Sequence, residues 1–227
     1  MPRGAKARAS FKAALLAVLT AIPTGLGYVL GPIAHSADRL LSMIVIPGLG
    51  PLPWKIHLGF MPLVVVTILA RVLLGRGAAI LEGILLAITG IIFHPSKPAV
   101  ITGPRDVLLG VGVELVLLKE GEGRAIGTAE AVVAGFFGGL LSYLPFLAFA
   151  PLPGPYALQS AALFYISILV MMSSYLVDCL IGGFIAGQVV KALPSTWLAG
   201  RGQALGGEAP VGSEPLGESP EGPRPVG

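Results

Sequence analysis

Four carboxylates that lie within long apolar runs of this chain are the residues best placed to do chemistry. They are Glu82, Asp106, Glu114 and Asp178. A charge inside a lipid bilayer is costly, so each such group needs a partner, a water-filled cavity or a ligand. Carboxylates of this kind accept hydrogen bonds from a ligand, form ion pairs or, when two lie close together, act as acid–base catalysts.

The motifs of several enzyme classes are missing from the sequence. It contains no glycine loop with a Walker lysine, no HExxH zinc-binding pair and no GxSxG serine. A single cysteine, Cys179, excludes an internal disulfide and a cysteine-based metal cluster. We therefore expect no catalytic residues, no metal and no cofactor. The enzymatic alternative that remains is a small intramembrane hydrolase that uses Glu82 and Glu114 on facing helices.

The composition indicates a protein whose solvent is lipid. Of its 227 residues 54% are hydrophobic and only 12% are charged, whereas about a quarter of the residues of a soluble domain are charged. The net charge is +3, but the basic residues form short clusters between apolar runs, which is typical of membrane-protein orientation rather than of nucleic-acid binding. We predict an all-α integral membrane protein that binds no nucleic acid.

Six apolar runs are about long enough to cross a bilayer core of ~30 Å at ~1.5 Å per residue. The predicted spans are residues 11–30, 58–74, 77–93, 101–118, 125–149 and 160–193. Residues 1–10 are then a basic arm, residues 11–193 a six-helix membrane domain, and residues 194–227, rich in Gly, Pro, Glu and Ser, a disordered tail. Residues 31–54 are predicted to be a long connection over the mouth of the bundle. We expect Pro23 to kink the first span.

The distribution of basic residues predicts which side of the membrane each connection occupies. With the N-terminus inside, eleven of the 15 Lys and Arg residues fall on the inner side and four on the outer side. The inner set is Arg3, Lys6, Arg8, Lys12, Arg71, Arg76, Lys119, Arg124, Lys191, Arg201 and Arg224. The outer set is Arg39, Lys55, Lys97 and Arg105. This positive-inside bias predicts a multi-pass protein of the cell membrane with both termini cytoplasmic.

Depth along the spans then decides which polar residues can meet a ligand from outside. Asp106 lies about 8 Å below the outer end of its span. The outer-half pocket that we predict draws on Trp54, His57, Asp106, Tyr143, Ser174, Tyr175 and Asp178. Two alternatives stay open: Trp54 and His57 are only anchors at the membrane boundary, and Asp106 is a simple interfacial charge beside Arg105.

Glu82 and Glu114 lie nearer the inner side and need a different explanation. They are either helix-to-helix ties to Arg71 or Arg76 or contacts to a cytoplasmic partner. Since Asp106, Gly110 and Glu114 are four residues apart, we expect them to share one side of their helix.

Ala13, Ala17 and Ala21 place small side chains four residues apart on the first span. Small residues at this spacing stack on one helix face and let another helix approach closely. The row serves either ordinary packing inside the bundle or docking of another protein.

Six short spans with the N-terminus inside resemble the substrate-binding S components of energy-coupling factor (ECF) transporters. The segments GFMP (59–62), RGAAILEG (76–83) and GVGVELV (110–116) are similar to those of the YkoE group, implicated in hydroxymethylpyrimidine or thiamine uptake. The alanine row resembles the motif by which S components dock on the T component. By its position, Asp106 is similar to the acidic residue that holds the aminopyrimidine in thiamine-binding S components.

This resemblance implies a binding protein without catalytic activity. It would capture thiamine or its hydroxymethylpyrimidine precursor from outside, beneath residues 31–54. It would then deliver the compound together with a T component and two ATPase subunits. The alternatives from other classes are the small intramembrane enzyme and a stand-alone secondary transporter or channel. We find no convincing internal repeat of the kind that secondary transporters usually show.

Overall fold

The computed structural model describes residues 3–46, 50–51, 60–93, 99–119, 126–149 and 161–194. Within these residues the chain forms six α-helices, and the predicted all-α class is confirmed. The helices are α1 (Arg3–Ser42), α2 (Met61–Leu74), α3 (Ala78–Phe93), α4 (Ala99–Val116), α5 (Thr128–Phe149) and α6 (Ala161–Ala192). A 3₁₀ turn (Leu117–Lys119) follows α4, and two antiparallel strands of two residues each, β1 (Val45–Ile46) and β2 (Gly50–Pro51), follow α1.

Three of these helices are long and apolar enough to cross a membrane. They are α1, α5 and α6, whose most apolar parts have mean hydropathies of 1.9, 1.8 and 2.0. The helices α2 and α3 are also apolar but shorter, with 14 and 16 residues. Length and composition therefore indicate that the chain is a membrane protein.

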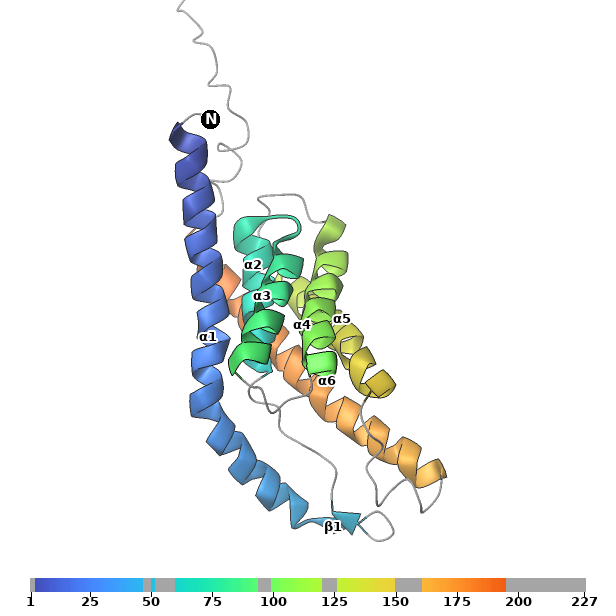
Figure 1. Cartoon of the computed structure of the whole chain (residues 1–227). Helices are drawn as coiled ribbons and strands as arrows, with labels where there is room; N and C mark the ends of the chain where they lie inside the picture. Colours follow the sequence, from blue (N-terminus) through green and yellow to red (C-terminus); the bar gives the residue numbers. More distant parts are fainter. Residues whose placement is uncertain are drawn as a thin grey trace, which may run out of the picture.

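The first helix is longer than the sequence predicts. It runs without interruption from Arg3 to Ser42 and contains Pro23 and Pro32. The predicted helix end at Leu30 is wrong, and so is the interpretation of residues 31–42 as connection. A proline inside a helix either kinks it or ends it, and Figure 1 shows the axis of α1 turning in its second half. The predicted arm, residues 1–10, is helical from Arg3. The other five helices begin and end within three residues of the predicted positions.

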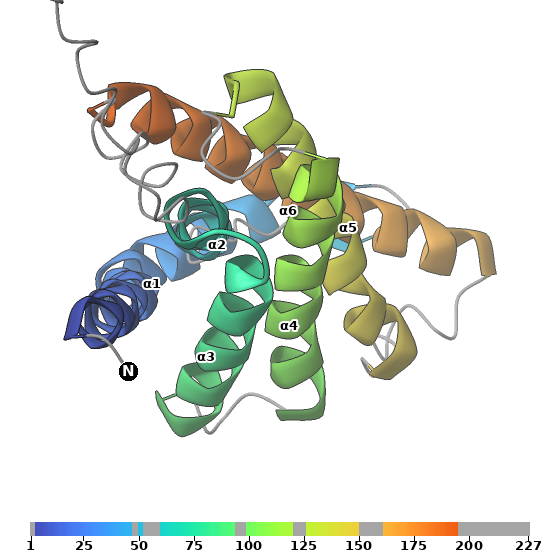
Figure 2. The same ribbon diagram turned by 90° about the horizontal axis from the view of Figure 1, so that it is seen from above.

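Successive helices run in alternating directions (Figure 1). At one end of the bundle the Lys12 ammonium donates to the Leu74 carbonyl at 3.3 Å. At the same end the backbone N–H of Gly77 donates to Glu114 Oε1 at 2.9 Å. The first part of α1, the α2–α3 turn and the last turn of α4 thus meet. Figure 2 shows α3 and α4 side by side, and in the described residues the main contacts of α1 are with α2 and α3.

Close backbone contact joins α3 to α4. A Cβ on Gly83 would lie 2.5 Å from the carbonyl oxygen of Asp106, and one on Gly110 would overlap the carbonyl of Ala79. Small residues permit such close approach in membrane proteins, where packing rather than hydrophobic burial drives helix association. The contact fixes the depth and the side of α4 on which Asp106 lies.

Within the described segments, several charged side chains lie in the interior and large apolar side chains lie on the surface. The outer helix faces expose large apolar side chains such as Val29, Ile92 and Leu169, which suits contact with lipid. Charged side chains lie inside and are almost fully buried; they are Arg71, Glu82, Asp106, Glu114 and Asp178. Each of them must be accounted for by a partner or a cavity, because burial of an uncompensated charge costs several kcal/mol (about 3–5 kcal/mol when a partner is removed).

The α3–α4 contact gives a first prediction. Gly110→Ala should lower the thermal stability of the detergent-solubilised protein, because the new methyl group overlaps the Ala79 carbonyl and overpacking costs about 1–3 kcal/mol. Gly25→Ala is the matched control: nothing lies within 4 Å of a Cβ there, and alanine gains up to about 1 kcal/mol in helix propensity. Equal melting temperatures for the two variants would contradict the close contact.

A polar pocket between α1 and the helix bundle

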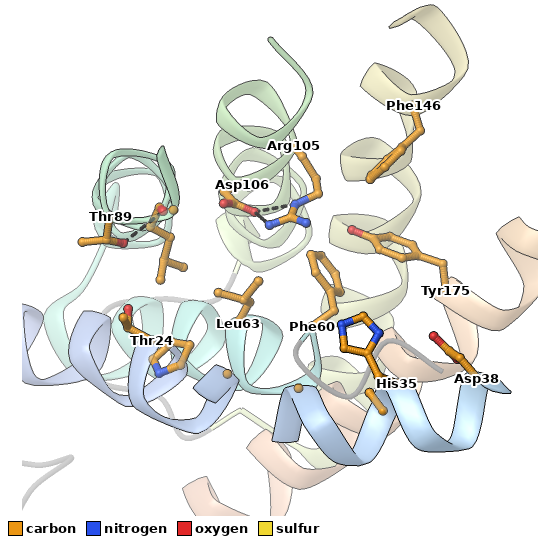
Figure 3. Close-up of a pocket in the computed structure, with 16 residues that line it drawn as sticks. Thr24, His35, Asp38, Phe60, Leu63, Thr89, Arg105, Asp106, Phe146 and Tyr175 are labelled. Atoms are coloured by element: carbon orange, nitrogen blue, oxygen red, sulfur yellow. Dashed lines mark hydrogen bonds and ion pairs between the residues drawn. The ribbon is translucent and has the colours of Figure 1, made fainter. Parts of the chain in front are cut away.

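A pocket of about 290 Å³ lies between the second half of α1 and the other helices (Figure 3). It combines two charged side chains of α4 with aromatic rings and a wall of small residues. Its principal lining residues are Thr24, Gly27, Gly31, His35, Asp38, Phe60, Leu63, Leu86, Thr89, Gly90, Arg105, Asp106, Phe146 and Tyr175. Pockets for small molecules begin at about 300 Å³ and are mostly apolar with a few polar groups.

The charged centre of the pocket is an ion pair between neighbours in the sequence. Arg105 Nε donates to Asp106 Oδ1 at 2.7 Å, and Nη2 of the same guanidinium lies 2.6 Å from that oxygen. The Asp106 side chain is 2% exposed and that of Arg105 15%. A Cβ on Gly90 of α3 would lie 3.7 Å from Asp106 Oδ2, so glycine at this position leaves open space beside the carboxylate.

Aromatic rings surround the guanidinium and form one wall. The carbon of the Arg105 guanidinium lies 5.2 Å from the centre of the Phe60 ring, within the range of a cation–π contact. The Phe60 ring lies 4.4 Å from that of Tyr175, centre to centre, and Phe146 lies 6.3 Å from Tyr175. The Tyr175 hydroxyl lies 2.8 Å from Ser142 Oγ, within hydrogen-bond distance, which fixes the ring for stacking.

The opposite wall is formed by α1. Gly27 and Gly31, four residues apart, present their backbone to the pocket, and His35 and Asp38 follow on the same side of the helix. In Figure 3 the His35 imidazole points toward the Phe60 ring. These residues lie on one face only because the helix continues beyond Leu30.

The structure unites two of the seven residues predicted to bind a ligand. Asp106 and Tyr175 line the pocket. Tyr143 lies behind them, with its ring 5.6 Å from that of Tyr175. Ser174 Oγ donates to the Met171 carbonyl of its own helix at 2.8 Å and does not line the pocket.

Of the other three predicted residues, Asp178 alone lies in the described part of the chain. Asp178 is 5% exposed and is not among the lining residues. Trp54 and His57 lie outside the described residues. The prediction that they bind a ligand stays a prediction.

Sequence reasoning missed most of the wall. Phe60, Phe146 and Arg105 come together only through helix packing, and no spacing within one segment connects them. His35 and Asp38 did leave a signal: Gly27, Gly31 and His35 continue a four-residue spacing past the expected end of the helix.

The inner carboxylates have separate environments. Arg71 Nε lies 3.0 Å from Glu114 Oε1, and Arg71 Nη2 donates to the Leu117 carbonyl at 2.8 Å. A helix-to-helix tie was one of the two interpretations of Glu114, and the structure shows it. Glu82 makes no such ion pair within the described residues; its Oε2 lies 3.2 Å from Thr20 Oγ1 on α1.

Ala13, Ala17 and Ala21 line a second, apolar groove between α1 and α3, with a volume of about 660 Å³. Their side chains are exposed, whereas Leu16 and Leu19 on the same helix are buried. The row is thus accessible to a partner helix or to lipid rather than closed by packing within this chain.

No protein family, curated protein or solved structure matches the chain. Among the described residues no group of three or more His, Cys, Asp and Glu side chains is arranged to hold a metal ion. The fold and the pocket define a class: a helical membrane protein with an ion pair and aromatic rings around an internal cavity.

The Arg105–Asp106 pair gives a second prediction. Arg105→Met should destabilise the protein by about 3–5 kcal/mol, because it leaves a buried carboxylate without its cation. Adding Asp106→Leu should restore part of this loss, since the pair is then replaced by apolar groups. Arg76→Met, at an exposed arginine, is the control. Unfolding in detergent is measured for these proteins and for Asp106→Leu alone, and additive losses in the double variant would show that the two side chains do not interact.

Proposed function

We propose that this protein is the substrate-binding S component of an ECF-type importer. It captures a thiamine-related pyrimidine from outside the cell and passes it on together with a T component and two ATPase subunits. The observation that carries the proposal is the pocket at the Arg105–Asp106 pair, a polar and aromatic site enclosed by apolar helices. Hydroxymethylpyrimidine is the ligand that we favour.

The chemistry of an aminopyrimidine suits this pocket. Its exocyclic amine is a hydrogen-bond donor for the Asp106 carboxylate, and its ring nitrogens accept from the Arg105 guanidinium. Charge-assisted bonds of this kind are about twice as strong as neutral ones. The flat ring stacks against Phe60 or Tyr175, where aromatic pairs contribute about 0.5–1.5 kcal/mol beyond their buried area.

The proposal includes a bundle in which all six helices cross the membrane with both termini in the cytoplasm. The 14 residues of α2 and 16 of α3 span about 21 and 24 Å. These lengths fall short of a ~30 Å core, and local thinning of the bilayer accommodates such a mismatch at modest cost. Alternating helix directions (Figure 1) and the position of Lys12 at the end of the α2–α3 turn support this topology.

Position along the helices supports access from outside. Thr89 and Gly90 line the pocket, and Gly77 ends the α2–α3 turn at the basic end. Thirteen residues separate Gly77 from Gly90, about 20 Å along a helix. Because positive charge marks the cytoplasmic side, the pocket then faces the external half of the membrane.

The accessible alanine row supports the partner assignment. Ala13, Ala17 and Ala21 line an open groove, and small residues of this kind let a foreign helix approach closely. The chain carries no Walker lysine motif, so energy for uptake has to come from other subunits. The T component with its two ATPases supplies it.

Calorimetry of the detergent-solubilised protein tests the ligand assignment. Wild type should bind hydroxymethylpyrimidine, and Asp106→Asn should weaken binding by about 10- to 100-fold, because a hydrogen bond to a charged group is worth about 1.5–3 kcal/mol. Gly90→Leu should abolish binding by filling the space beside Asp106 without displacing backbone. Gly25→Leu, where a side chain meets nothing within 4 Å, should bind as wild type does.

Two results would contradict this proposal at different levels. Folded wild type that binds neither hydroxymethylpyrimidine nor thiamine removes the ligand assignment. If affinity is unchanged in both Asp106→Asn and Gly90→Leu, the ligand binds at another site.

A further inference from the structure

Glu82 is a buried acid that the binding pocket does not use. It lies on α3, has no exposed surface, and faces α1 through its contact with Thr20. One helical turn further on, Thr24 of α1 and Leu86 of α3 both line the pocket. The Thr20–Glu82 contact therefore joins the two helices directly beneath the place where they form opposite walls of the cavity.

Hydrogen-bond accounting indicates which atom carries the proton. Thr20 Oγ1 lies 2.9 Å from the Leu16 carbonyl and 3.2 Å from Glu82 Oε2. A hydroxyl group has one proton to donate, and the carbonyl of Leu16 can only accept. If the Thr20 proton goes to this nearer oxygen, the contact with Glu82 is a hydrogen bond only when the carboxyl group donates. The second oxygen, Glu82 Oε1, is buried and has no hydrogen-bond partner.

Three cations on the helices around Glu82 already have partners among the described residues. Lys12 on α1 donates to the Leu74 carbonyl, Arg71 on α2 pairs with Glu114 of α4, and on α4 Arg105 pairs with Asp106. No ion pair joins any of these to Glu82 in the part of the chain that the structure describes.

Other titratable groups on these helices lie far from Glu82 along the chain. Tyr28, His35, Asp38 and Arg39 follow Thr20 on α1 by at least eight residues, about 12 Å along the helix axis. Arg76, in the α2–α3 turn six residues before Glu82, is exposed and no ion pair joins it to Glu82. Within the described residues a carboxylate at Glu82 would thus be ionised without a paired cation. Burial of an unpaired charge is far more costly than burial of a neutral acid.

We propose that Glu82 binds a proton that holds α1 against α3, and that release of this proton loosens α1 and opens the pocket. The Glu82 carboxyl loses its proton to water that enters the parted interface, and its hydrogen bond to Thr20 Oγ1 is lost. Since the main helix contacts of α1 in the described residues are with α2 and α3, we take it to be the helix most readily displaced. The packed state holds one more proton than the open state, so rising pH favours opening.

The proton site can be tested without any ligand. Infrared spectra of the protein in lipid should contain the carbonyl stretch of a protonated carboxyl group at neutral pH. This band should be lost in Glu82→Gln. In Thr20→Val it should shift in frequency, because the hydrogen-bond partner is gone; this second variant retains Glu82 and serves if Glu82→Gln does not fold. Absence of a band that depends on either residue would overturn the proposal.

The movement has its own measurement. Spin labels on Val29→Cys of α1 and Ile92→Cys of α3 occupy positions that are each 64% exposed, whereas the single native thiol, Cys179, is fully buried. The distance between the labels should increase with pH in wild type and stay constant in Glu82→Gln. A distance that is independent of pH, or one that changes with sodium at fixed pH, would overturn the assignment of the proton as the ligand.

The consequence for uptake rests on the proposed function. Affinity for hydroxymethylpyrimidine should fall by about tenfold per pH unit once Glu82 loses its proton, since only the protonated form closes the pocket. Glu82→Gln should bind with constant affinity. If the label distance changes with pH while hydroxymethylpyrimidine does not bind at any pH, the proton site at Glu82 is supported and the proposed ligand is rejected.

Discussion

An ion pair between two consecutive residues, Arg105 and Asp106, is the interaction on which the site depends. Buried ion pairs add little net stability, because desolvation offsets the attraction between the charges, and apolar replacements are often as stable. This pair lies in a cavity surrounded by aromatic rings rather than in packed core. Its position beside open space is what makes it a recognition element, since a ligand finds both a donor and an acceptor there.

The same chemistry has a different consequence at the other end of α4. Glu114 also pairs with an arginine, but the backbone N–H of Gly77 donates to the same carboxylate and the Leu117 carbonyl accepts from Arg71. That pair joins three helix ends. Glycines account for the contrast: close approach of α3 to α4 at Gly110 closes the inner part of the interface, and the missing side chain at Gly90 leaves space beside Asp106.

Local sequence signals predicted the helices, whereas tertiary contacts determine which residues line the pocket. Apolar runs gave five of the six helices almost completely, because length and composition are properties of one segment. The prediction ended the first span at Leu30, whereas α1 continues through Pro32 to Ser42; a proline that ends a helix and one that bends it look alike in sequence. The place of Asp106 in the pocket could be predicted, because a carboxylate in an apolar run needs a partner, a cavity or a ligand. Phe60 and Phe146 could not, because ordinary apolar residues become a binding wall only through the helices they pack beside.

Native mass spectrometry of the protein extracted from its own membranes addresses the central claim most directly. The account predicts that wild type carries a small molecule whose fragments contain a pyrimidine ring. Gly90→Leu, extracted in parallel, should carry none, because the substituted side chain occupies the space beside Asp106. Wild type and Gly90→Leu that differ in mass only by the substitution, with no bound molecule in either, would contradict the assignment of this cavity as a ligand site.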